Sequence, residues 1–152
     1  MFADGFRVAE ALRASDPAAF ELLATQPVEF RFHDASCDIR TSATLIETDR
    51  EGKLQRIRFN NWLRGATLYP EARLEPMYEA LGHFWRMLRD PGYQLHLRLR
   101  PGDLIAYDNH RVLHGRAPFD ASSGERHLQG CYINLEDVDS RLRMLDREPA
   151  NI

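Results

Sequence analysis

The chain has 152 residues, enough to bury the core of one domain, and its composition is ordinary for a soluble globular protein. A net charge of −3, with acidic and basic residues interspersed, argues against nucleic acid or a membrane surface as a partner. The two cysteines make no disulfide framework and no apolar run is long enough to cross a bilayer or to act as a secretory signal, so we expect a cytoplasmic protein.

Two helices are predicted at the start of the chain. Residues 4–14 have apolar side chains at helical spacing, and Asp4 can cap the helix. Asp16 and Pro17 then begin a second helix as its cap and first residue. A helix that starts so close to Met1 suggests that further sequence once preceded it.

From Val28 the apolar period changes to two, which predicts strands. The strand candidates are residues 28–33, 42–47 and 53–60, the last two forming a hairpin around a turn at 49–52. This hairpin ends in Asn60 and Asn61, two amides that either hold a small polar ligand or satisfy a turn.

One long amphipathic helix and three more strands are predicted in the second half. The helix spans residues 74–89 with an apolar stripe that includes Met77, Tyr78, Trp85 and Leu88. Residues 93–99 alternate most regularly, and a turn at residues 101–103 leads to strand-like runs at 104–107 and 128–133. Asn134 would cap a final helix with an inward side formed by Val138, Leu142 and Leu145. The pattern favours a β-rich α+β fold, an antiparallel barrel or sandwich with helices packed outside.

A polar segment between the runs at 104–107 and 128–133 concentrates the candidate functional residues. Its histidines and arginines are His110, Arg111, His114, Arg116 and Arg126. Because alternate residues of a strand share a face, Arg126, Leu128, Gly130 and Tyr132 would line one side. That side would offer a guanidinium to a carboxylate and an aromatic ring to a flat or cationic group.

The same segment carries a family resemblance. Residues 108–116, DNHRVLHGR, and 124–132, GERHLQGCY, resemble the C-terminal signature of the γ-butyrobetaine dioxygenase and trimethyllysine dioxygenase family. This family is similar to the wider taurine-dioxygenase-like group of Fe(II)/2-oxoglutarate oxygenases. Residues 58–61 and 140–145 also resemble parts of these proteins. The resemblance implies a double-stranded β-helix, or jelly-roll, core with flanking helices, and it makes residues 1–152 the C-terminal part of a single oxygenase catalytic domain.

The resemblance also implies a set of site residues and cofactors. His114 would be the C-terminal histidine ligand of Fe(II), and Arg126 would hold the distal carboxylate of 2-oxoglutarate. Tyr132 would contribute to an aromatic cage around a quaternary ammonium group, and Asn60 or Asn61 would contact substrate or co-substrate. Ascorbate would serve as reductant. A surface or core role remains the alternative for each side chain, and His110 departs from the family pattern because an aromatic residue commonly stands there.

The other half of such an iron site is absent from the sequence. The family takes its remaining ligands from a His-x-Asp or His-x-Glu pair, and none of the 6 histidines begins one. We therefore expect a fold that is incomplete at its N-terminal side, and a chain that is inactive alone unless a neighbouring chain completes it.

Three classes of function remain open. The first is an oxygenase that hydroxylates a small trimethylammonium carboxylate, as in the conversion of γ-butyrobetaine to carnitine, or else trimethyllysine or another taurine-dioxygenase-like substrate. The second is a non-catalytic jelly-roll remnant that binds a small carboxylate through Arg126. The third is a structural or dimerisation module, and a homodimer of the complete protein is also left open.

Overall fold

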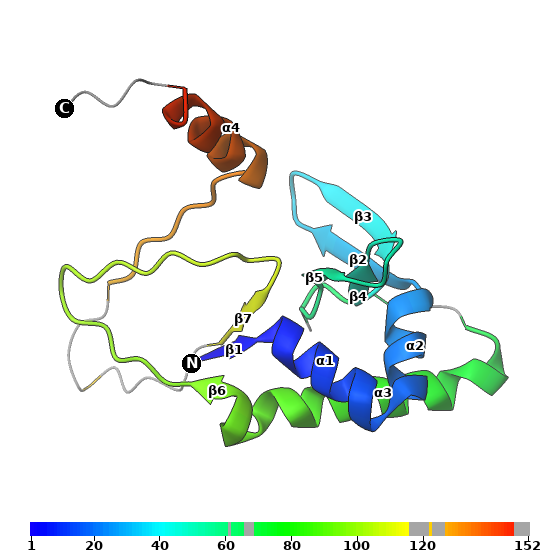
Figure 1. The fold of residues 1–152 in the computed structure, drawn as a ribbon. Coiled ribbons are helices and arrows are strands. Elements are labelled where there is room, and N and C mark those ends of the chain that lie inside the picture. The colour runs from blue at the N-terminus through cyan, green and yellow to red at the C-terminus, as the bar shows by residue number, and fades with distance from the viewer. Residues whose placement is uncertain (61, 66–68, 116–121, 123–126, 148–152) are drawn as a thin grey trace. The chain divides into compact units, whose positions relative to one another are not determined.

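The computed structural model describes all residues except 61, 66–68, 116–121, 123–126 and 148–152 (Figure 1). The chain divides into two compact units, Met1–Ala117 and Pro118–Ile152. The sequence-based calls at Asn61 and Arg126 lie outside the described residues. No helix in the described ranges is both long enough and apolar enough to cross a membrane.

The two N-terminal helices of the first unit begin where their caps predict. Asp4 precedes α1 (Gly5–Ser15), and its carboxylate accepts hydrogen bonds from the backbone N–H groups of Phe6 and Arg7. Asp16 precedes α2 (Pro17–Thr25) and accepts from the N–H of Ala19. Each cap satisfies N–H groups that have no partner inside the helix, which explains why these local signals predicted both helices correctly.

The long helix α3 (Glu71–Arg89) is confirmed, but its buried side differs from the predicted stripe. Met77 and Leu88 are buried as expected, whereas Tyr78 is 70% exposed. The buried side is completed by Ala80 and Phe84 instead. The stripe was wrong at Tyr78 and Trp85, because it followed the largest side chains. Small Ala80 and neighbouring Phe84 face the core instead.

Helices α1, α2 and α3 form one hydrophobic core with the hairpin of β4 (Ile46–Thr48) and β5 (Leu54–Ile57) (Figure 1). The largest fully buried side chains come from all of these parts and from the loop before β4. They are Phe84, Leu12, Leu23, Leu45, Ile46, Met77 and Val8.

Three small antiparallel sheets complete the first unit within the described residues. The first has the order β6 (Gln94–Leu95), β1 (Phe2–Asp4), β7 (Val112–His114). The second pairs β2 (Val28–His33) with β3 (Asp38–Ala43), and the third pairs β4 with β5. The mixture of helices and antiparallel sheets agrees with the α+β part of the expectation. The β-rich part was wrong for the described residues, because the helices span more of them than the strands do. The predicted jelly roll is not confirmed, because the strands form separate small sheets with two or three members.

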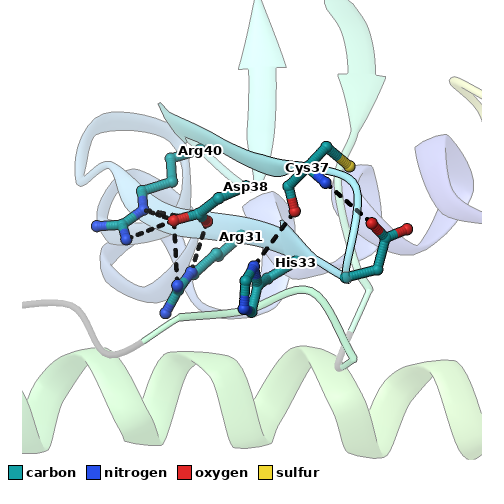
Figure 2. Close-up of polar contacts among 6 residues, drawn as sticks. Arg31, His33, Cys37, Asp38 and Arg40 are labelled. Carbon is teal, nitrogen blue, oxygen red and sulfur yellow. Dashed lines mark hydrogen bonds and ion pairs between the residues drawn. The ribbon is translucent and has the colours of Figure 1, made fainter.

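The β2–β3 hairpin carries a polar cluster near its turn (Figure 2). Asp38 forms ion pairs with Arg31 at 2.7 Å and with Arg40 at 2.7 Å. At the turn, the Asp34 carboxylate accepts hydrogen bonds from the N–H groups of Ser36 and Cys37. These contacts close the turn locally, while Val28 and Phe30 at the other end of β2 are buried in the core. The predicted strand at 28–33 is confirmed.

Several predicted strands are absent, shortened or divided. The candidate at 42–47 is divided between the end of β3 and the start of β4, and the candidate at 53–60 is shortened to β5. The run at 93–99 begins with a 3₁₀ turn (Pro91–Tyr93) and forms a strand only at β6, and the runs at 104–107 and 128–133 form none. The turn between 99 and 104 is confirmed, since Asp103 N–H donates to the carbonyl of Arg100 at 3.0 Å and Gly102 has a positive φ of 89°. Alternation predicts which side of a strand is apolar, but a strand also needs a neighbouring strand to pair with. In the described part of the chain, β6 pairs with β1, whereas residues 104–107 and 128–133 belong to no sheet.

The second unit contains one described helix, α4 (Leu135–Leu145). Asn134 precedes it as predicted, although its side chain makes no capping hydrogen bond. The expected inward side was wrong for this structure, because Val138, Leu142 and Leu145 are all exposed. The amphipathic pattern is present, but nothing in the described part of this unit covers its apolar side.

Candidate functional site

His114 is the last residue of β7, and the pairing of β7 with β1 decides which way its side chain points. The register sets Phe2 opposite His114 and Ala3 opposite Leu113. Ala3 is buried, and Leu113 packs against the core. Because neighbouring strand residues point to opposite faces, Phe2 and His114 lie on the face of the sheet turned away from the core. The structure therefore leaves the imidazole of His114 accessible, and the residue is exposed.

Two aromatic rings accompany the imidazole. The ring centroid of Tyr107 lies 5.1 Å from that of His114 and 5.5 Å from that of Phe2. Within the described residues, neither ring nitrogen of His114 makes a hydrogen bond. A histidine that is held by ring contacts while its nitrogens stay open can act as a ligand or as a proton acceptor.

The turn before β7 is tied to the β4–β5 hairpin and to α1. Asp108 begins the turn, and its carboxylate accepts from the N–H of His110 at 2.8 Å. The carbonyl of His110 accepts from the N–H of Ile57 at 2.8 Å, and its Nδ1 lies 3.3 Å from a guanidinium nitrogen of Arg56. His110 is therefore a half-buried structural residue at the base of β7.

The Arg111 side chain forms an ion pair with Asp4. Its terminal nitrogen lies 2.6 Å from one carboxylate oxygen, and Nε donates to the other at 3.0 Å. The guanidinium lowers the pKa of Asp4 below its ordinary value, so this carboxylate is charged at neutral pH. The pair joins β7 to the start of α1.

Of the remaining predicted site residues, the structure describes Asn60 in the first unit and Tyr132 in the second. Asn60 is exposed, and its side-chain oxygen accepts from the N–H of Trp62 at 2.9 Å, which is the turn-satisfying role that the sequence left open. Tyr132 belongs to the second unit, where it is 85% exposed. Residues 127–133 have no strand structure, so Leu128, Gly130 and Tyr132 do not form the predicted strand face, and Arg126 lies outside the described residues.

The described donors can be tested against the iron site that the sequence implies. A non-haem Fe(II) site of this kind needs two histidines and one carboxylate. Across the described ranges, no group of 3 or more His, Cys, Asp or Glu side chains is placed to hold a metal ion. The described residues therefore do not fit a complete iron site, and His114 offers a single imidazole to one.

With this geometry established, sequence comparison identifies the class of protein. A family model for the taurine catabolism dioxygenase TauD, TfdA family, matches residues 1–132. The chain belongs to this dioxygenase family.

Individual relatives refine the comparison. The chain is 43% identical over 146 residues to the γ-butyrobetaine dioxygenase of Pseudomonas sp. (strain AK-1), covering 96% of this chain and 38% of that protein. It is 35% identical to the human γ-butyrobetaine dioxygenase, covering 97% of this chain and 40% of the relative. It is 36% identical to the trimethyllysine dioxygenase of Neurospora crassa, and this match covers 94% of this chain and 31% of the relative. The chain thus spans two fifths or less of the length of each of these relatives.

Sequence reasoning missed the partners of His114. Phe2 comes from the opposite end of the unit, and Tyr107 was assigned only to a strand, so no local pattern connected either ring to the histidine. The Asp4–Arg111 pair was missed for the same reason. Asp4 was interpreted as a helix cap, which is correct, but its second role depends on a residue 107 positions away.

Proposed function

We propose that this chain is part of an Fe(II)/2-oxoglutarate-dependent dioxygenase that hydroxylates a small trimethylammonium carboxylate, with γ-butyrobetaine as the preferred candidate. The family match supports the dioxygenase class. The relatives named γ-butyrobetaine dioxygenase support the substrate class. A trimethyllysine or another taurine-type substrate is the alternative within the same class, since trimethyllysine dioxygenases are also among the relatives.

The observation that carries the proposal is the placement of His114. The residue that the family signature singles out lies at a strand end, faces away from the core and keeps both ring nitrogens open within the described residues. A core histidine would instead be buried and hydrogen-bonded. His114 would supply one ligand to iron, and Tyr107 and Phe2 would limit the orientations of its ring.

The binding roles of the other residues follow from their chemistry. Arg126 would hold a carboxylate of 2-oxoglutarate, because a guanidinium can bind both carboxylate oxygens at once. Tyr132 would contact the trimethylammonium group through its ring face, and its exposed ring is free of the core. Asn60 and Asn61 would donate amide hydrogen bonds to substrate or co-substrate.

We further propose that the chain alone does not turn over substrate. Its sequence has no His-x-Asp or His-x-Glu pair, and the described residues offer His114 without companion ligands. The missing ligands would come from a further segment of the oxygenase or from a neighbouring chain.

The test is succinate formation from 2-oxoglutarate by the purified chain with Fe(II), ascorbate and O2, with and without γ-butyrobetaine or trimethyllysine. We expect no turnover by the chain alone, and substrate-stimulated turnover once a family segment carrying His-x-Asp is added. His114→Ala should abolish the restored turnover, whereas His96→Ala should not, because His96 is exposed and its side chain forms a hydrogen bond with neighbouring Gln94. Substrate-stimulated turnover by the chain alone would overturn the proposed inactivity, and no turnover under any addition would overturn the enzyme proposal.

A second candidate function is carboxylate binding without catalysis. It is favoured by the lack of a metal-ligand cluster in the described part of the chain. Calorimetric titration with 2-oxoglutarate distinguishes the two functions. Binding that needs Arg126 but persists in His114→Ala and in the presence of a chelator supports the binding function, whereas binding that requires Fe(II) and His114 supports the oxygenase.

A further inference from the structure

Arg111 lies at the point where the strand of His114 begins, and its guanidinium binds the Asp4 carboxylate with two nitrogens. Nε is 3.0 Å from Oδ1 and the terminal nitrogen is 2.6 Å from Oδ2. A guanidinium that binds both oxygens of a carboxylate fixes direction as well as distance. The contact therefore restrains how β7 can lie against β1.

The acceptor of this contact is itself fixed. Asp4 Oδ1 accepts the N–H of Phe6 at 3.1 Å and the N–H of Arg7 at 3.3 Å, which holds the carboxylate against the first turn of α1. The Asp4 side chain cannot follow a displaced arginine without releasing this helix cap. Arg111 is thus anchored to the helix, and not only to a mobile side chain.

A backbone hydrogen bond joins the two segments at the same place. The N–H of Gly5 donates to the carbonyl of Arg111 at 2.9 Å. A Cβ atom at Gly5 would lie 2.8 Å from that carbonyl and 3.0 Å from a side-chain carbon of Ile57. The Arg111 guanidinium also lies over the Phe6 ring at 5.5 Å. Three consecutive residues, Asp4, Gly5 and Phe6, therefore contact Arg111.

This fixed point matters because β1 and β7 are short. Each has 3 residues, so the ladder between them contains few hydrogen bonds to define its register. A slip by one residue would turn every side chain of β7 to the other face. His114 would then point toward the side now occupied by Ala3 and Leu113, which is the core.

We propose that Arg111 is a positioning residue, and that its two-nitrogen contact with Asp4 sets the strand register that presents His114 beside Tyr107 and Phe2. The role of His114 as a ligand rests on the function proposed above, but the register does not. Arg111 itself touches no substrate in this proposal; it acts through the orientation of His114.

Another ion pair provides a matched control. Arg31 also binds an aspartate, Asp38, with Nε at 2.7 Å and a terminal nitrogen at 3.1 Å. The side-chain exposures of the two pairs are similar, 51% and 34% for Arg111 and Asp4 against 45% and 34% for Arg31 and Asp38. The control pair lies in a different sheet, so replacing Arg31 by lysine makes the same chemical change away from β7.

The experiment compares Arg111→Lys with Arg31→Lys in the full chain by NMR. Lysine keeps the charge but cannot bind both oxygens in a fixed plane. We expect Arg111→Lys to weaken or remove the ring-proton contacts between His114 and Tyr107. We also expect the N–H of Gly115, which donates to the Met1 carbonyl, to exchange about tenfold faster or more. Arg31→Lys should leave both signals unchanged.

The proposal is overturned if Arg111→Lys lowers the melting temperature as Arg31→Lys does but keeps the His114–Tyr107 contacts and the protection of Gly115. Should Arg111→Lys fail to fold, Asp4→Asn tests the same contact through the same two NMR signals. Asparagine retains a capping oxygen but loses the charge that attracts Arg111. These signals do not depend on iron or turnover. If no added family segment restores turnover and Arg111→Lys still shifts the register, the proposed function is contradicted and the positioning role remains supported.

Discussion

The Asp16 carboxylate connects two helices, since one oxygen caps α2 and the other lies 3.0 Å from Nδ1 of His83 on α3. The first contact is local and the second spans 67 residues. One side chain therefore begins α2 and also fixes where α3 passes it.

The double role of Asp16 predicts an ordered pair of substitutions. Asp16→Ala should lower the denaturation midpoint more than Asp16→Asn, because asparagine keeps a capping oxygen while alanine loses both contacts. Urea denaturation of both variants at the same pH and temperature measures the difference in midpoint. Equal midpoints for the two variants would show that the cap does not stabilise the fold.

The same residue predicts a dependence on pH. The hydrogen bond from the Ala19 N–H, with that from His83, holds the pKa of Asp16 below its ordinary value. A lowered folded-state pKa means that this contribution to stability is complete above the unfolded value of about 3.9 and is lost as the pH falls through the folded value. Wild-type and Asp16→Asn proteins should therefore converge in stability in acid, as followed by thermal melts between pH 6 and pH 2.

Phe84 predicts the largest loss of stability from a single truncation. It is fully buried in the core, and its ring lies 5.3 Å from that of Phe59. Phe84→Ala should cost about 3–5 kcal/mol in free energy of unfolding, because it leaves a cavity. Glu79→Ala on the exposed side of the same helix is the control and should change stability by about 0.5 kcal/mol or less. A similar loss for both variants would contradict the assigned buried side of α3.

The close packing around Gly5 predicts that one added methyl group at this position destabilises the fold. Its added Cβ would meet the Arg111 carbonyl at 2.8 Å, whereas a Cβ at Gly130 meets nothing within 4 Å in the described structure. Gly5→Ala should destabilise the first unit by about 1–3 kcal/mol despite the higher helix propensity of alanine. Gly130→Ala should leave thermal stability unchanged, and a neutral Gly5→Ala would mean that β7 lies farther from α1.

The two ion pairs of Asp38 predict that its carboxylate resists protonation. It lies between Arg40 and Arg31 on the β2–β3 hairpin, and their hydrogen bonds hold its pKa far below the ordinary range (Figure 2). Replacing either arginine by glutamine should raise this pKa part of the way, and replacing both should bring it close to the ordinary value. NMR titration of the carboxyl carbon measures it, and an unchanged pKa in the double variant would contradict the pairing.

The helices and turns were predictable because their signals are local. Asp4, Asp16 and Gly102 each act within a few residues of their own position, and each does in the structure what its residue type favours. The buried side of α3 was less predictable, because Phe84 and Trp85 are neighbours and either could have faced the core. The packing of α3 against the rest of the core, which lies far away in the sequence, decides between them.

The sheets and the environment of His114 were predictable only in part. The histidine itself follows from the family signature, but its ring neighbours depend on β1 pairing with β7 across more than one hundred residues. The alternation at 93–99 indicated an extended segment, yet alternation alone cannot supply the neighbouring strand on which a sheet depends. The local sequence signature therefore identified His114, and long-range strand pairing determines which side chains surround it.

The position of β1 between β6 and β7 has a consequence for synthesis on the ribosome. Translation runs from the N-terminal side to the C-terminal side, so Phe2–Asp4 is synthesised before its partners at Gln94–Leu95 and Val112–His114. Helix α1 can form early, but β1 cannot pair with β6 or β7 until these later strands have been translated. Pairings over such long separations slow folding. Pulse-labelled nascent chains should therefore protect the amides of α1 and α2 before those of β1.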